Sequence, residues 1–197
     1  SAWDGPGRLT LDDEARLLRE LILTVGTPVH LVGHSYGGAV SIRLALTGQA
    51  PLRSLTLIEP MIYPLLRSAG EDALFTETMR VGEAFLAAAQ NAAEDAWKQF
   101  TDYYNGAGSW AALPESARAG LLARTAVIVH RWHALMSNPT SVEDCRRLKV
   151  ETLVLCGDRT SKPERRMSEI VASVLPRCRF TFIEDAGHMS PLTHAPV

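Results

Sequence analysis

Short apolar runs alternate along the chain with longer segments in which apolar residues recur at helical spacing. Four of these runs are short, rich in aliphatic or aromatic residues, and followed directly by Gly or Glu, which is typical of buried strands. The predicted strands are Val29–Val32, Leu55–Ile58, Thr152–Cys156 and Arg179–Ile183. Because helical segments separate successive strands, the pattern predicts an α/β fold with a parallel sheet.

Helices are predicted on both sides of these strands. After a Gly- and Pro-rich loop, Ser1–Thr10, the first helix begins with Thr10 as its cap and ends before Gly26. Its apolar positions recur at helical spacing and are expected to pack on the sheet: Leu11, Ala15, Leu18, Leu21 and Ile22. Two further helices are predicted at Ala39–Thr47 and Pro163–Val174.

The segment from Met61 to about Arg147 has a different pattern. It is rich in Ala, Leu and Glu, contains no strand pattern, and has helical runs near 72–90, 92–104 and 114–136. It also holds much of the aromatic content, which we expect mainly to pack in a core, with some members lining an apolar pocket: Trp97, Tyr103, Tyr104, Trp110 and Trp132. This segment is therefore predicted to be a helical insertion between the second and third strands.

The first strand runs into Gly33–Gly37, which has the pattern G-x-S-x-G, and a helix follows it. A strand, a tight turn and a helix around this pattern favour a nucleophile elbow over an ordinary glycine-rich turn. Gly33 and Gly37 are expected to omit side chains where strand and helix crowd each other. Ser35 is then exposed at the end of the strand, and the backbone N–H of Tyr36 is a candidate oxyanion donor at the helix N-terminus.

A serine hydroxyl is a weak nucleophile unless a general base and an orienting group activate it. His188 is the candidate base because it follows the fourth strand in the short loop Glu184–His188, at the same sheet edge as Ser35. The remaining histidines have less specific positions, in a strand, in the elbow, on an inserted helix or near the C-terminus: His30, His34, His130, His133 and His194.

Gly33–Gly38, Gly157-Asp158 and Ala186–His188 together resemble the α/β-hydrolase superfamily, and the resemblance covers essentially the whole chain. It implies an α/β-hydrolase fold, with a mostly parallel sheet flanked by helices and a helical cap inserted between strands. Residues 1–60 would form the core with the elbow, 61–147 the cap, and 148–197 the part of the core with the acid and histidine. The resemblance implies a small-molecule substrate and neither a metal nor an organic cofactor.

Two residues are candidates for the acid that orients His188. Glu59 directly follows the second strand, the placement found in some haloalkane dehalogenases, whereas Asp158 follows the third strand. Many family members place the acid after this later strand as Gly-x-x-Asp, but that position here is Thr160. The sequence leaves both carboxylates open.

The first strand is apolar on both faces and is therefore expected to have a neighbouring strand at each edge. Leu55–Ile58 can supply one neighbour, and in the family earlier strands supply the other, together with a second oxyanion donor. The chain also ends soon after His188, before an expected final helix. The sequence is accordingly expected to be a fragment of a longer protein.

The bulk composition excludes several other classes. The chain has 197 residues, 20 basic and 22 acidic side chains and a net charge of −2, with no basic run that would indicate nucleic acid or an anionic membrane. Its three widely spaced cysteines, Cys145, Cys156 and Cys178, favour reduced thiols over disulfides or a metal site. No targeting segment is visible, and a cytoplasmic location is expected.

These features predict a serine hydrolase that acts on an ester-like or other carbonyl substrate through an acyl-enzyme intermediate. Acyltransferases and cofactor-free perhydrolases use the same three residue types, so the reaction subclass stays open. The alternatives are a non-catalytic ligand-binding or receptor protein on the same fold, and an inert fragment with half an oxyanion hole.

Overall fold

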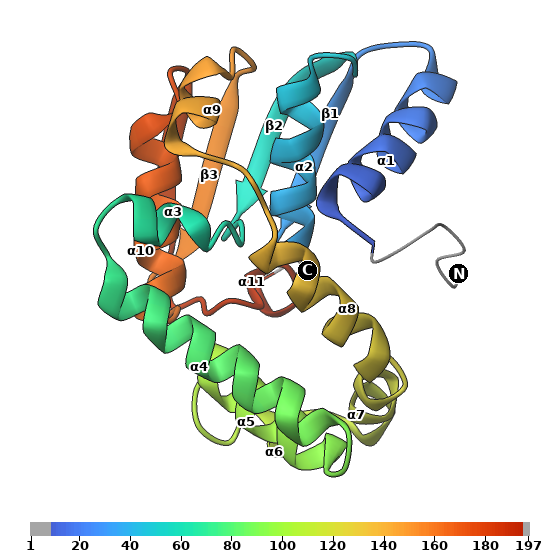
Figure 1. The fold of residues 1–197 in the computed structure, drawn as a ribbon, viewed down its shortest axis with the longest axis vertical. Coiled ribbons are helices and arrows are strands. Elements are labelled where there is room, and N and C mark those ends of the chain that lie inside the picture. Colours follow the sequence, from blue (N-terminus) through green and yellow to red (C-terminus); the bar gives the residue numbers. More distant parts are fainter. Residues whose placement is uncertain (1–8, 195–197) are drawn as a thin grey trace.

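The computed structural model in Figure 1 describes residues 9–194, so most of the predicted loop Ser1–Thr10 lies outside the described residues. Within that range the sheet has four parallel strands in the order β1-β2-β3-β4. They are β1 (Val29–His34), β2 (Leu52–Ile58), β3 (Thr152–Gly157) and β4 (Cys178–Ile183). The four predicted strands and the parallel α/β fold are thereby confirmed, with β2 beginning three residues before its predicted start.

Hydrogen bonds between adjacent strands continue for one residue beyond the strand ends. The N–H of Ser35 donates to Ile58 O at 2.9 Å, and the N–H of Glu59 donates to Leu155 O at 3.0 Å. The carboxyl ends of the strands are therefore aligned along one edge of the sheet, where the loops that carry polar side chains meet.

Three long helices accompany the strands: α1 (Leu11–Val25), α2 (Tyr36–Thr47) and α10 (Lys162–Val174). The predicted cap of α1 is confirmed, because the Thr10 side chain accepts from the N–H of Asp13 in a reciprocal capping box. The predicted burial of Leu21 is wrong: this side chain is 63% exposed. α1 packs chiefly against α2, and Leu21 lies about a quarter turn away from the buried face of α1.

β1 has a neighbouring strand at only one of its edges in the described part of the chain. β2 pairs along its full length, but no strand of residues 9–194 occupies the other edge, and Val32 is 61% exposed. The expected second neighbour is therefore not found within these residues.

The segment between β2 and β3 is entirely helical apart from its connections, as predicted. Its helices are α3 (Pro64–Ser68), α4 (Asp72–Ala89), α5 (Ala93–Asn105), α6 (Ser109–Ala112), α7 (Glu115–Leu122), α8 (Thr125–Met136) and α9 (Val142–Arg147). The run predicted near 114–136 is divided at Ala123–Arg124 into α7 and α8. In Figure 1, α4 to α7 occupy the lower part of the view and the strands the upper part, with α11 (Ser190–Thr193) between them.

Most aromatic residues of the inserted helices pack in a core, as expected: Trp97 and Trp110 belong to a cluster within the insertion, whereas Tyr104 and Trp132 belong to the main core. Phe85 from α4 packs edge-to-face on Trp97 from α5, with ring centroids 5.2 Å apart, and Trp110 joins the same buried cluster. Trp132 of α8 packs against Gly82 so closely that any side chain at Gly82 would overlap the indole ring. Burial of these rings fixes the inserted helices relative to one another.

The elbow is crowded at Gly33 and Gly38 and open at Gly37. A Cβ atom at Gly33 would lie 2.5 Å from the Ser41 Oγ, and one at Gly38 would lie 2.7 Å from the Pro60 Cβ. At Gly37 it would meet nothing within 4 Å, so the expectation that Gly37 relieves crowding is wrong. The close approach of α2 to the segment after β2 depends on Gly38 instead.

This difference predicts opposite outcomes for two neighbouring substitutions. Gly38→Ala is expected to lower the free energy of unfolding by about 1–3 kcal/mol, because the new methyl group overlaps the backbone and ring of Pro60. Gly37→Ala, the matched control, is expected to keep or raise stability by up to about 1 kcal/mol, since Ala favours a helix. Urea denaturation followed by circular dichroism measures both, and an equal loss in the two variants would contradict the assignment.

Candidate active site

A chain of hydrogen bonds joins Ser35, His188 and Glu59 at the carboxyl edge of the sheet. The Nε2 of His188 lies 2.9 Å from the Ser35 Oγ, and its Nδ1 lies 2.7 Å from the Glu59 Oε2. His188 is 5% exposed and Glu59 is fully buried. The structure therefore brings together the predicted serine and histidine and one of the two predicted acids.

The carboxylate of Glu59 determines which nitrogen of His188 carries the proton. A carboxylate can only accept, so Nδ1 donates its N–H to Glu59 and Nε2 is left with a lone pair toward Ser35. The Ser35 hydroxyl also lies 3.2 Å from the Met61 Sδ, but a thioether is a weak acceptor. The single hydroxyl proton is accordingly directed to His188.

Glu59 is buried with a full set of hydrogen-bond donors around it. The N–H of Gly157 donates to Oε1 at 2.7 Å, and the Thr160 hydroxyl donates to Oε2 at 2.7 Å. Burial alone would raise the pKa of Glu59, but the hydrogen bond from His188, the charge of His188 when it is protonated, and the bonds from Thr160 and Gly157 hold that pKa below its usual value. Glu59 is therefore kept ionised although water does not reach it.

Asp158 follows β3 as predicted, yet no hydrogen bond joins it to His188 in residues 9–194. Its N–H donates to Ile183 O on β4 and its carbonyl accepts from Arg165, while its Oδ1 is buried without a hydrogen-bond partner. Thr160 occupies the usual place of the acid, and its hydroxyl supports Glu59. Of the two candidates, only Glu59 reaches the histidine.

The backbone at both strand ends adopts a conformation that is rare for residues with a side chain. Ser35 has a φ of 56° and Glu59 a φ of 44°. Such conformations cost about 1–3 kcal/mol each and persist only where the surroundings hold them. Here the N–H of Met61 donates to Ser35 O at 3.1 Å, which ties the two turns to each other.

Tyr36 begins α2 directly after Ser35. Its N–H makes no hydrogen bond within the described residues, as expected for the first N–H of a helix. The Arg131 guanidinium of α8 lies 4.8 Å from the centre of the Tyr36 ring. Tyr36 thus combines an unused backbone donor beside Ser35 with a side-chain contact to the inserted helices.

His34 supports the loop that carries His188, a role that the sequence analysis missed. Its Nε2 donates to the backbone oxygen of His188 at 2.7 Å, and the two rings lie 4.9 Å apart. Burial and the neighbouring His188 lower the pKa of His34, so it is held neutral. The variable position of a G-x-S-x-G pattern has no signal for such a contact, because the partner is far away in the sequence.

Tyr104 covers another side of His188. Its ring centre lies 5.3 Å from that of the imidazole, and its hydroxyl lies 3.0 Å from the Tyr63 hydroxyl in a fully buried pair. Tyr104 belongs to α5, so an inserted helix contributes directly to the surroundings of the histidine.

Glu164 is a second buried carboxyl group near this site. It lies in the first turn of α10, and Ser161 donates to its Oε2, whereas its Oε1 has no partner among the described residues. Burial, with smaller contributions from the charges of Glu59 and Glu77, raises the pKa of Glu164 to about 8. Glu164 is therefore protonated at neutral pH.

A cavity of about 800 Å³ opens beside His188, between α5 to α7 and the loop that leads into α11. Its walls are mainly aromatic and aliphatic and include Trp97, Phe100, Leu113 and Leu121. A cavity of this size and composition is typical of sites for small organic molecules.

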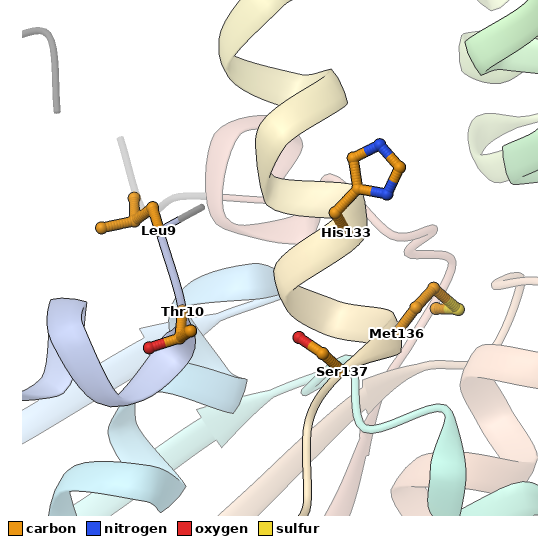
Figure 2. Close-up of a pocket in the computed structure, with 5 residues that line it drawn as sticks. All are labelled: Leu9, Thr10, His133, Met136 and Ser137. Atoms are coloured by element: carbon orange, nitrogen blue, oxygen red, sulfur yellow. The ribbon is translucent and has the colours of Figure 1, made fainter. Parts of the chain in front are cut away.

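A smaller cavity of about 420 Å³ lies between the start of α1 and the end of α8. Figure 2 shows its lining residues: Leu9, Thr10, His133, Met136 and Ser137. None of them is part of the hydrogen-bonded chain, and the larger cavity is therefore the candidate substrate site. Residues 9–194 contain no cluster of three potential metal ligands, and none of their helices has the length and apolarity needed to cross a bilayer.

Comparisons with known proteins agree with this architecture. Residues 2–197 match the family model described as "Alpha/beta hydrolase family". Among solved structures, MenH from S. aureus superposes with a TM-score of 0.74 at 17% identity, covering 98% of this chain and 73% of its own. A thermophilic esterase from Thermogutta terrifontis has a TM-score of 0.73 at 23% identity, with coverages of 96% and 69%. A bromoperoxidase from Bacillus anthracis has a TM-score of 0.73 at 18% identity, with coverages of 98% and 72%.

At these identities the solved structures establish a common fold. No curated protein sequence matches the chain significantly.

The buried carboxyl of Glu164 predicts a pH-dependent stability. Unfolding lowers its pKa from about 8 to the ordinary 4.5, so the native protein holds a proton that the unfolded chain releases between these values. The free energy of unfolding should therefore fall as pH rises through this range, by up to about 1.4 kcal/mol per pH unit. Glu164→Gln should remove that contribution to the slope.

Urea denaturation at pH 5.5, 6.5 and 7.5 measures this difference between wild type and Glu164→Gln. The exposed Glu115→Gln on α7 is the control and should keep the wild-type slope. An unchanged slope in Glu164→Gln would show that the carboxyl titrates normally in the native protein.

Proposed function

Because the chain belongs to the alpha/beta hydrolase family, we propose that it is a serine hydrolase that acts on carbonyl compounds through an acyl-enzyme intermediate. Ser35 is the nucleophile, His188 the general base and Glu59 the acid that orients it. The observation that carries this proposal is the unbroken chain of hydrogen bonds from the Glu59 carboxylate through both nitrogens of His188 to the Ser35 Oγ. The same arrangement of residue types activates serine in unrelated folds.

In the first half-reaction, the Ser35 Oγ attacks the carbonyl carbon while its proton passes to Nε2 of His188. The imidazolium that results is stabilised by the buried charge of Glu59. The negative charge that develops on the carbonyl oxygen is stabilised by the N–H of Tyr36 at the start of α2. His188 then gives its proton to the leaving group, and the acyl group remains on Ser35.

In the second half-reaction, His188 takes a proton from water as the water oxygen attacks the acyl carbonyl. His188 then returns this proton to the departing Ser35 Oγ, and the acyl group is released as a carboxylic acid. This step needs no metal or organic cofactor. The aromatic and aliphatic walls of the large cavity support an apolar substrate, such as an ester, lactone or thioester. The presence of an esterase among the proteins of similar fold fits this class.

Residues 61–147 act in this proposal as a cap over the site. Tyr104 from α5 contacts His188, and α5 to α7 contribute much of the cavity wall. Substrate selection would then depend on the inserted helices, and catalysis on the loops at the sheet edge.

Active-site labelling tests the nucleophile directly. A fluorophosphonate should form a bond from the Ser35 Oγ to phosphorus with loss of fluoride, and mass spectrometry should locate the adduct on Ser35. Ser35→Ala should abolish the adduct, and Glu59→Gln should slow hydrolysis of a p-nitrophenyl ester by about 10³–10⁴-fold. The matched control Asp158→Asn should stay within about threefold of wild type.

A folded protein that is not labelled at Ser35 would refute the hydrolase mechanism and favour a non-catalytic ligand-binding protein. Equal losses in Glu59→Gln and Asp158→Asn would refute the assignment of the acid.

His34 is expected to act as a positioning residue for His188. His34→Ala removes the donor to the His188 carbonyl, and the loss of about 1 kcal/mol should lower kcat roughly five- to tenfold with little change in KM. His34→Gln keeps an N–H of similar reach and should restore most of kcat. A loss of thermal stability with an unchanged kcat in both variants would indicate a structural role alone.

A further inference from the structure

In the described part of the chain, the large cavity is lined by one permanently charged basic side chain and one acidic side chain, and only the acidic one forms an ion pair. Among its described lining residues, only Arg124 and Asp185 carry a charge that is permanent at neutral pH. Asp185 forms an ion pair with Arg159, so its charge is neutralised locally. Arg124 forms no ion pair within residues 9–194. The cavity therefore presents one uncompensated positive charge.

Arg124 lies between α7 and α8, and its guanidinium is largely unused. Its one assigned contact runs from Nη1 to Gly120 O at 3.5 Å, which is at the limit of a hydrogen bond. A guanidinium has five N–H donors in a planar fork that matches the two oxygens of a carboxylate. At least four donors therefore remain for a ligand.

The cavity that both Arg124 and His188 line has apolar as well as polar walls. Phe100, Leu113 and Leu121 contribute aromatic and aliphatic surface, and Asp185 is the only carboxylate among the described residues of the lining. Arg124 is exposed, so its attraction for a bound anion acts partly through solvent and is weakened by salt. The cavity thus combines an apolar body, a cation on its wall and a candidate catalytic histidine.

We propose that the substrate is an amphiphilic carbonyl compound that carries a carboxylate, which Arg124 binds while the apolar part occupies the cavity. The inference rests on the proposed function, because Ser35 must attack the carbonyl of the same molecule. Arg124 is a specificity-determining residue here and takes no part in bond making or breaking.

The alternative explanation of Arg124 is structural. It lies two residues beyond the last residue of α7, and a cation near the C-terminal end of a helix interacts favourably with the terminal carbonyl groups. A capping role would affect the fold and all substrates equally, whereas carboxylate binding would affect charged substrates only. Matched charged and neutral substrates separate the two roles.

The test uses p-nitrophenyl monoesters of the dicarboxylic acids with four, six, eight and ten carbons. Each is compared with a neutral partner in which the distant carboxylate is a methyl ester. Wild-type protein should have a kcat/KM about tenfold or more higher for the charged member at one or more chain lengths. Arg124→Gln should abolish this preference and leave kcat/KM for the neutral member within about twofold.

Two further variants control for charge and for general effects of substitution on α7. Arg124→Lys should keep part of the preference, because the charge remains while the planar fork is lost. Arg118→Gln, on the preceding helix α7 but not among the residues that line the cavity, should behave as wild type. The preference should also weaken at high salt, since ions screen the charge pair.

Two outcomes would overturn the proposal: no charge preference in the wild type at any chain length, or an equal loss for both members of a pair in Arg124→Gln. Hydrolysis of the neutral esters with an adduct on Ser35 would still support the proposed function.

If no ester is hydrolysed, calorimetry on the Ser35→Ala protein decides the binding question. The monomethylamide of octanedioic acid should then bind at least about tenfold more tightly than its bis-methylamide, and equal binding would overturn the proposal.

Discussion

The site depends on keeping one carboxylate charged in the interior. Glu59 is fully buried, and an ionised carboxylate is tolerated there only when its oxygens are paired. Its partners come from two other parts of the chain: Gly157 at the end of β3 with Thr160 after it, and His188 after β4. The same bonds that lower the pKa of Glu59 therefore fix the spacing of three loops at the sheet edge. Because the Glu59 carboxylate must be paired, the packing of the sheet and the orientation of His188 depend on each other.

His188 is consequently confined from several directions. Glu59 holds one ring nitrogen, His34 holds the backbone oxygen, and Tyr104 packs against the ring. A side chain held in one orientation loses little entropy when a ligand binds, which favours a preformed site. Two of these contacts come from the sheet edge and one from an inserted helix, so the insertion contributes to the surroundings of His188 as well as to the cavity.

The common fold does not specify the substrate, because the sheet edge positions the candidate catalytic residues and the inserted helices form most of the cavity wall. Ser35, His188 and Glu59 depend on strand ends that the fold aligns, whereas the walls of the cavity come largely from α5 to α7. Related proteins can keep the first set and vary the second. The uncompensated charge of Arg124 lies in the inserted segment, which supplies much of the cavity wall.

The sequence by itself determined the α/β fold, the elbow around Ser35 and the candidate base His188, because strand–turn–helix order and glycine spacing are local properties. It left Glu59 and Asp158 open, since both follow strands that end at one edge. Only the tertiary structure shows which of them contacts His188: the hydrogen bond from His188 to Glu59 spans 129 positions and depends on donors from a neighbouring strand end. The same holds for the hydrogen bond from His34 to the His188 backbone oxygen, which joins segments far apart in the sequence. It also holds for the crowding at Gly38 rather than Gly37, which depends on the approach of Pro60.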